Sequence, residues 1–197
     1  MKNLIASVLA ALGLGGTSAL AKDSSQTADG SVMEGLRMQA LSLKAEDIGL
    51  SRANFPKDVW GVLLETGYDN GAFSLVVLGD GTASLYFSTG GGIIGAGQHD
   101  AVRSACANLL GGASRFMAAA ASTKSYPLPR QGQVTFYFLT YDGVLSYSAK
   151  EIELGEGRDK LSSLFHAGHE VIARMREIEQ ARHNNALKDD VPEGTHP

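Results

Sequence analysis

The chain has 197 residues, a length that suits one domain with terminal extensions. Its net charge is −4, and Lys and Arg are scattered, so the sequence lacks the basic stripe that is typical of nucleic-acid-binding proteins. The single cysteine, Cys106, excludes an intramolecular disulfide and a zinc site built from several cysteines. Glycine is unusually frequent, with 24 residues, and many of them lie in a few loops, which indicates tight turns.

The first 21 residues have the pattern of a signal peptide. Lys2 precedes an apolar run over residues 4–14, and Ala19 and Ala21 form the small-residue pattern that a signal peptidase accepts. The run is too short for a stable membrane span. We therefore expect an exported protein, periplasmic or secreted. The alternative is a retained amphipathic helix on a cytoplasmic protein.

Composition divides the remainder of the chain. Residues 22–32 have almost no large apolar side chains and are predicted to be a linker. Residues 33–180 alternate apolar patterns with turn signals and are predicted to form one domain. Residues 181–197 are predicted to be a disordered tail.

The first half of the domain predicts a short helix followed by a three-stranded meander. Moderate apolar spacing favours a helix over residues 34–43. Apolar runs predict strands over residues 59–65, 73–78 and 83–87. The turns between them are Asp69-Asn70-Gly71 and Gly79-Asp80-Gly81.

The second half predicts a helix, a hairpin and a final helix. Apolar residues at three- and four-residue steps indicate a helix over residues 98–121, in which Gly111 and Gly112 are unfavourable. Strands over residues 134–141 and 144–148 flank Asp142-Gly143, a strong hairpin signal. A second stripe predicts a helix over residues 161–180. The predicted fold is a single α+β domain with a mainly antiparallel five-stranded sheet covered by amphipathic helices.

Four sequence blocks resemble a family of uncharacterised bacterial proteins over residues 35–178, approximately. The blocks are Val59-Trp60-Gly61-Val62, the run from Ser84 to Gly95, Leu154-Gly155-Glu156-Gly157-Arg158, and the run from Leu164 to His169. This resemblance implies no activity, and similar proteins begin near Met33, which favours the cytoplasmic alternative. The element order also resembles profilin-like, PAS-like and roadblock-type modules, which implies binding of small ligands or protein partners.

The glycine loop at residues 90–97 is the first candidate site. Gly90-Gly91-Gly92-Ile93-Ile94-Gly95 matches the G-x-G-x-x-G pattern letter by letter and lies between a strand and a helix. No acidic residue follows about 20 positions later, and the preceding strand closes a meander, so a dinucleotide site is disfavoured. The favoured interpretation is a tight connection with positive φ, and the alternative is an anion bound by the loop amides.

The second candidate group lies near the last helix. His166 and His169 are spaced for one helix face, but the His-Glu-x-x-His pattern of zinc proteases is missing, so we expect surface histidines and no metal site. Arg158 either clamps an anion or pairs with Glu156 or Glu151. Cys106 lies on an apolar stripe and is expected to be a buried, unreactive thiol.

The sequence favours a non-catalytic binding module whose partner is an unknown protein, a second copy of the chain or a small anionic ligand. No cofactor and no nucleic-acid partner are expected. The candidate binding residues are Gly90, Gly91, Gly92, Gly95, Arg158 and His169. The alternative is a hydrolase or transferase in which the glycine loop holds an anionic substrate, Arg158 clamps it, and His166 or His169 transfers protons.

Overall fold

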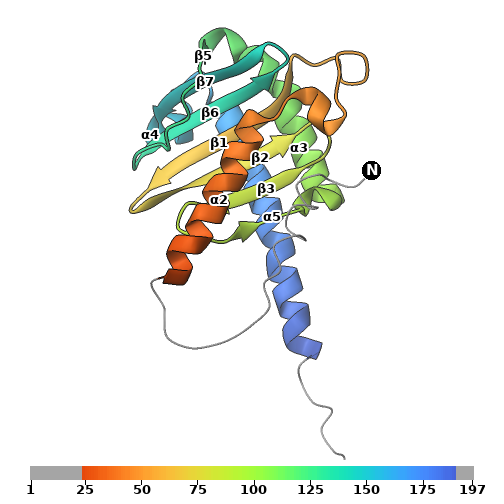
Figure 1. Cartoon of the computed structure of the whole chain (residues 1–197), viewed down its shortest axis with the longest axis vertical. Helices are drawn as coiled ribbons and strands as arrows, with labels where there is room; N and C mark the ends of the chain where they lie inside the picture. Colours follow the sequence, from red (N-terminus) through yellow and green to blue (C-terminus); the bar gives the residue numbers. More distant parts are fainter. Residues whose placement is uncertain (1–23, 190–197) are drawn as a thin grey trace, which may run out of the picture.

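A seven-stranded antiparallel sheet forms the centre of the structure, a computed structural model that describes residues 24–189 (Figure 1). The strands lie in the order β4-β3-β2-β1-β6-β7-β5. Their bounds are β1 Val59–Tyr68, β2 Gly71–Leu78, β3 Ala83–Phe87, β4 Gly92–Ile93, β5 Ala121–Ser122, β6 Gln133–Thr140 and β7 Gly143–Lys150. Strand β1 is therefore central, between its hairpin partner β2 and the later strand β6.

Helices cover both faces of this sheet. Helix α2 crosses one face, and α3 and α5 cover the other (Figure 1). The helices are α2 Ser24–Ser42, α3 Asp100–Ala113, α4 Glu151–Gly155 and α5 Ser162–Asp189, with 3₁₀ helices η1 Ala45–Ile48, η2 Ala96–Gln98 and η3 Ser114–Ala119. The predicted α+β domain with a mainly antiparallel sheet covered by helices is confirmed.

The five predicted strands all form, but the predicted number of strands is wrong. The two additional strands, β4 and β5, have two residues each and lie at opposite edges of the sheet. Two residues cannot show the alternation of apolar and polar side chains by which a strand is recognised in a sequence. The predicted hairpin turns are present, and Asn70 and Gly81 adopt the positive φ values of 64° and 92° that such turns require.

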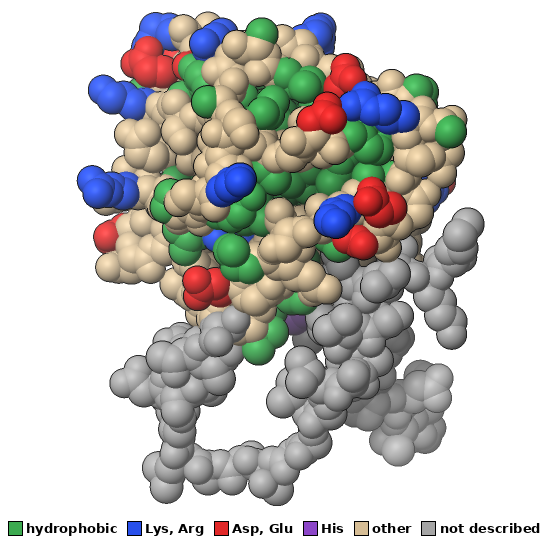
Figure 2. Space-filling view, turned by 45° about the horizontal axis from the view of Figure 1, so that its top comes forward, with side chains coloured by type: hydrophobic (Ala, Val, Ile, Leu, Met, Phe, Trp, Pro, Cys, Tyr) green, Lys and Arg blue, Asp and Glu red, His purple; other side chains and the backbone are tan. Residues whose placement is uncertain are grey.

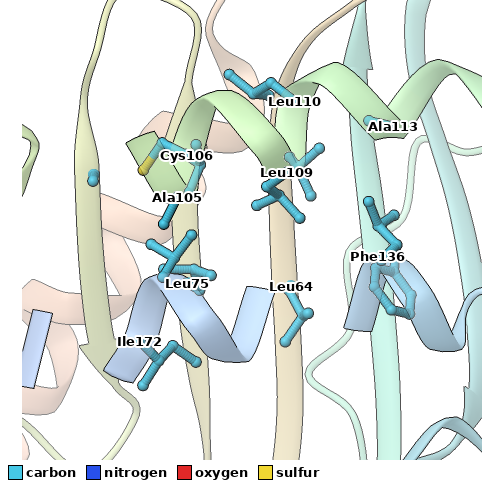
Figure 3. Close-up of a cluster of buried hydrophobic side chains, with 14 of the residues drawn as sticks. Leu64, Leu75, Ala105, Cys106, Leu109, Leu110, Ala113, Phe136 and Ile172 are labelled. Carbon is cyan, nitrogen blue, oxygen red and sulfur yellow. The ribbon is translucent and has the colours of Figure 1, made fainter. Parts of the chain in front are cut away.

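The larger core lies between the sheet and the helices α3 and α5. In Figure 3, Ala105 and Leu109 of α3 point toward Leu75 and Leu64 of the sheet, and Ile172 approaches from α5. The register explains this cluster, because the row across the sheet at this level consists of the apolar residues Leu85, Leu75, Leu64 and Phe136, each opposite the next. A row of matched apolar side chains thus holds the two helices against the sheet.

A second, smaller core lies under α2. Leu36 and Leu41 of this helix pack in the same buried cluster as Leu63 and Trp60 of β1. Burial on both faces explains why β1 reads as a nearly continuous apolar run in the sequence.

Two helices are longer than predicted, and one is shorter. Helix α2 begins at Ser24, inside the predicted linker, and α5 continues through residues 181–189 of the predicted tail. An apolar stripe marks only the docked part of a helix, and hydrogen bonding propagates beyond it at little cost. Helix α3 ends at Ala113, and the predicted remainder forms η3, whose Phe116 and Met117 still pack against the core.

One face of the molecule shows how the surface is composed. On the face in Figure 2, hydrophobic side chains gather near the middle, and Lys, Arg, Asp and Glu side chains surround them.

Among the described residues, no helix combines the length and the apolar character needed to cross a bilayer. The predicted signal peptide falls on residues 1–21, which lie outside the described part of the chain.

Candidate functional site

The glycine loop forms a tight hairpin between β3 and β4. The Gly90 amide donates to the Phe87 carbonyl oxygen at 2.9 Å, and the Phe87 amide donates to the Gly91 carbonyl oxygen at 3.1 Å. Gly90 and Gly91 adopt φ values of 107° and 77°, which L side chains rarely adopt. The structure therefore gives these two glycines the turn geometry that the favoured interpretation required.

The rest of the loop does not run directly into a helix. Gly92 pairs with Tyr86 in the sheet, and a Cβ at Gly92 would overlap the Leu85 carbonyl oxygen. Gly95, with φ 74°, leads into the 3₁₀ helix η2, and α3 begins only at Asp100. A phosphate-binding glycine loop places its free amides at the N-terminus of the following helix, and this arrangement is not formed here.

Arg158 follows α4 and is occupied by two carboxylates. Its Nε and Nη2 donate to the Glu153 carboxylate at 2.8 and 2.9 Å, and its Nη1 forms an ion pair with Glu156. The hydrogen bond from Arg158 lowers the pKa of Glu153 below its usual value. Of the two roles considered for Arg158, the geometry is that of surface pairing, with Glu153 in addition to the expected Glu156.

The two histidines of α5 have different surroundings. His166 is exposed, as expected, but His169 is only partly exposed, so the expectation of two ordinary surface histidines is wrong for His169. The His169 ring lies 4.3 Å from the Phe165 ring and 6.3 Å from the Phe73 ring of β2, measured between centroids. Phe73 comes from a different part of the chain, which helix periodicity cannot reveal.

His169 carries an unsatisfied ring nitrogen. Its Nε2 atom is buried and has no hydrogen-bond partner among the described residues. Burial lowers the pKa of His169, and the charges of His166 and Arg176 lower it further, so the ring is neutral at pH 7. A buried nitrogen without a partner costs about 1–3 kcal/mol, and a ligand that supplies the missing hydrogen bond recovers part of this cost.

His169 and Phe165 line an open groove of about 590 Å³ beside α4. The start of β6, the end of β7 and the residues of α4 form its other walls, namely Gly132, Gln133, Lys150, Glu151, Ile152, Gly155 and Glu156. Ile152 is 56% exposed, although large apolar side chains usually are buried. The volume lies within the range of about 300–1,000 Å³ that is typical of small-molecule sites. We refer to this feature as the α4–α5 groove.

The glycine loop lies far from the α4–α5 groove. Strands β3, β2 and β1 separate β4 from β6, which is about 19 Å at 4.8 Å per strand spacing. Arg158 is closer, because it pairs with Glu156 at the rim of the groove. The three groups that the enzyme hypothesis requires in one pocket are therefore not brought together in the described structure.

A buried ion pair on the opposite face was not identified from the sequence. Arg37 of α2 donates from Nε and Nη2 to the two carboxylate oxygens of Glu65, at 2.6 and 2.8 Å. Glu65 is 0% exposed and Arg37 is 4% exposed. Nη2 of Arg37 also donates to the Tyr126 carbonyl oxygen at 2.8 Å, and the Ser74 hydroxyl donates to Glu65 at 2.9 Å. This pair joins α2 to the sheet.

Strand register explains why Glu65 has polar neighbours. One row across the sheet under α2 consists of Tyr86, Ser74, Glu65, Thr135 and Ser148, each directly opposite the next. Burial raises the pKa of Glu65, and the hydrogen bonds from Arg37 and Ser74 offset part of that effect. The only sequence signal was an acidic last residue in the predicted strand over residues 59–65, which is also typical of a strand end.

Cys106 of α3 is buried in the larger core, as expected. Burial raises the pKa of its thiol to about 11, so the nucleophilic thiolate is scarce at neutral pH.

Within residues 24–189, no group of three or more His, Cys, Asp or Glu side chains is arranged to hold a metal ion.

Comparison of the chain with protein-family models, with curated proteins and with solved structures finds no match.

Proposed function

We propose that this domain is a non-catalytic binding module that takes a small, mainly apolar or aromatic molecule into the α4–α5 groove. The observation that carries the proposal is the α4–α5 groove itself, which is lined by the exposed Ile152 and by the partly exposed His169. The Nε2 of His169 has no hydrogen-bond partner among the described residues, so a ligand that reaches this nitrogen would supply the missing hydrogen bond. Phe165 and Ile152 supply the apolar contacts beside it.

The charges around the groove favour an uncharged ligand. Lys150 contributes a positive charge, and Glu151 and Glu156 contribute two negative charges. Arg158, the cation expected to clamp an anion, already pairs with Glu153 and Glu156. An anion would have to compete with these carboxylates, whereas an uncharged aromatic molecule can stack on Phe165 and hydrogen-bond to His169.

The same arrangement supports binding rather than catalysis. The glycine loop and Arg158, which the enzyme hypothesis requires to hold the substrate for proton transfer by a histidine, do not line this groove. The hydrolase or transferase alternative remains a prediction from the sequence, without a specific structural observation in its favour.

Indole and phenol are suitable first probes, because each combines an aromatic ring with one hydrogen-bonding group. At a probe concentration ten times the dissociation constant, binding to the folded state should raise the melting temperature by about 3–6 °C. Replacing His169 by Leu removes the nitrogen and should abolish this shift. Replacing His166 by Ala is the matched control, since His166 lies three residues earlier on the same helix, is exposed and does not line the groove.

The pH dependence of binding provides a second readout. Burial holds the pKa of His169 below its usual value, so the neutral ring should bind the probe at pH 7, and binding should weaken at pH values low enough to protonate the ring. Equal loss of binding in both histidine variants would refute the proposal. A metal-dependent rise in melting temperature that disappears in His166→Ala would instead favour a metal site.

A further inference from the structure

The block Leu154-Gly155-Glu156-Gly157-Arg158 ends α4 in a tight turn at the rim of the α4–α5 groove. The Gly157 amide donates to the Leu154 carbonyl oxygen at 3.3 Å, and the Arg158 amide donates to the Glu153 carbonyl oxygen at 2.9 Å. Gly157 has a φ of 76°, which is typical of the glycine that follows the end of a helix. The chain therefore reverses at Gly157, which places Arg158 beside Glu153 in the preceding helix.

The Arg158 side chain pairs with two carboxylates of this segment. Its Nε and Nη2 donate to the two carboxylate oxygens of Glu153, and its Nη1 pairs with Glu156. A single ion pair at the surface contributes little to stability, but a bidentate arginine in a network of charges contributes more. Glu156 lines the α4–α5 groove, and Glu153 directly follows Ile152, which also lines it. Arg158 thus fixes two positions along the α4 wall of the groove from outside its lining.

Packing alone does not fix the side of α4 that faces the groove. A helix of five residues is too short to be stable by itself. Leu154 is buried in the larger core, and the Glu151 amide donates to the Gly132 carbonyl oxygen at 2.9 Å, so the inner side and the start of α4 are anchored. Ile152 on the groove side is exposed. The ion pairs of Arg158 supply an attachment at the C-terminal end of the helix.

We propose that Arg158 is a positioning residue of the α4–α5 groove, which it preorganises by holding α4 and its turn in place. This inference rests on the proposed function, because it assumes that the groove binds an uncharged molecule. A preorganised wall does not have to be ordered when the ligand arrives, so the ion pairs of Arg158 should increase affinity without any contact to the ligand.

The ionic nature of this attachment predicts an effect of salt. Arg158, Glu153 and Glu156 are all exposed, so dissolved salt weakens their attraction. An uncharged ligand has no charge of its own for salt to screen. A decrease in its affinity at high salt would therefore come from the groove itself.

Arg174→Gln is a matched control for Arg158→Gln. Arg174 of α5 is also exposed and also pairs with two carboxylates, Glu170 and Glu177, and neither of these lines the groove. Indole titration of the full chain by isothermal titration calorimetry should show about two- to tenfold weaker binding in Arg158→Gln and unchanged binding in Arg174→Gln. Glu153→Gln removes the bidentate partner and should weaken indole binding in the same way as Arg158→Gln.

The same titration at two salt concentrations tests the ionic attachment. Raising sodium chloride from about 0.01 M to about 1 M shortens the Debye length from about 30 Å to about 3 Å, and it should weaken indole binding to the unmodified protein. In Arg158→Gln, which has already lost these ion pairs, the affinity for indole should not change with salt.

Hydrogen exchange of the ligand-free chain separates this inference from the proposed function. Arg158→Gln should speed exchange of the Glu156 and Gly157 amides, and Arg174→Gln should not. Unchanged exchange in Arg158→Gln, or equal weakening of indole binding in both variants, would overturn the role of Arg158 while the groove remained a binding site. Absence of indole binding to the unmodified protein would refute the proposed function, and this inference with it.

Discussion

Replacing Arg37 by Met should destabilise the domain by about 3–5 kcal/mol, because it leaves the Glu65 carboxylate buried without a counter-ion. The magnitude follows from the geometry. Glu65 loses the hydrogen bonds from Arg37 Nε and Nη2, each worth about 1.5–3 kcal/mol to a charged group, and keeps only that from Ser74. Met retains most of the apolar stem of Arg37, so packing contributes little to the loss.

Urea unfolding followed by Trp60 fluorescence measures this effect. Trp60 is the only tryptophan, and it is buried in the same cluster under α2. The expected loss corresponds to a decrease in melting temperature of roughly 6–20 °C. The double variant Arg37→Met/Glu65→Leu removes both charges and should lie within about 1 kcal/mol of the unmodified protein, because a buried ion pair and an apolar pair of similar volume are often equally stable.

The pH dependence follows from the direction of the Glu65 pKa. In the Arg37→Met variant, burial raises the folded-state pKa of Glu65 without the offset from Arg37, so the folded variant binds a proton more readily than the unfolded chain. Its stability should therefore recover relative to the unmodified protein as the pH falls from 7 toward 5. A loss below about 1 kcal/mol in Arg37→Met, or additive losses in the double variant, would refute this reasoning.

Two further predictions concern the core and its turns. Gly97→Ala should destabilise the fold by about 1–3 kcal/mol or more, because the new Cβ would overlap the Gly81 carbonyl oxygen. Gly111→Ala on the exposed surface of α3 should instead stabilise the fold by about 0.5–1 kcal/mol, because alanine favours the helix more than glycine does. Urea unfolding of both variants checks the difference, and equal effects would contradict it. Cys106 should react with a thiol reagent at pH 8 only as fast as local unfolding of the native protein exposes it, because the thiol is buried and burial raises its pKa to about 11. Immediate reaction of the native protein would contradict this burial.

The hairpins were predictable because their signals are local. Asp-Asn-Gly at residues 69–71 and Asp142-Gly143 place residues that tolerate positive φ between apolar runs, and both turns form as expected. The order of strands was not predictable in the same way. Strand β1 pairs with β6, and their partners Glu65 and Thr135 are 70 positions apart (135 − 65). No short-range pattern encodes such a pairing.

The candidate sites show the same limit. The spacing placed His166 and His169 on one face of the last predicted helix, but only β2 brings Phe73 against His169, and only β6 and β7 complete the α4–α5 groove. Arg37 was an unremarked charge in a predicted short helix, and its partner Glu65 lies 28 residues later. Both sites depend on contacts between distant segments, which a reading of periodicity cannot supply.

The central place of β1 in the sheet has a consequence for how the chain must be made. Strand β1 leaves the ribosome before the other strands of the sheet. One of its two edges, however, pairs only with β6, which lies in the second half of the chain. Until then, β1 presents unpaired amides and carbonyls along the edge that pairs with β6 from Val59 to Thr66. A nascent or truncated chain that ends before β6 therefore exposes a template for intermolecular β-pairing, and a chaperone that shields this strand would protect the protein from aggregation during synthesis.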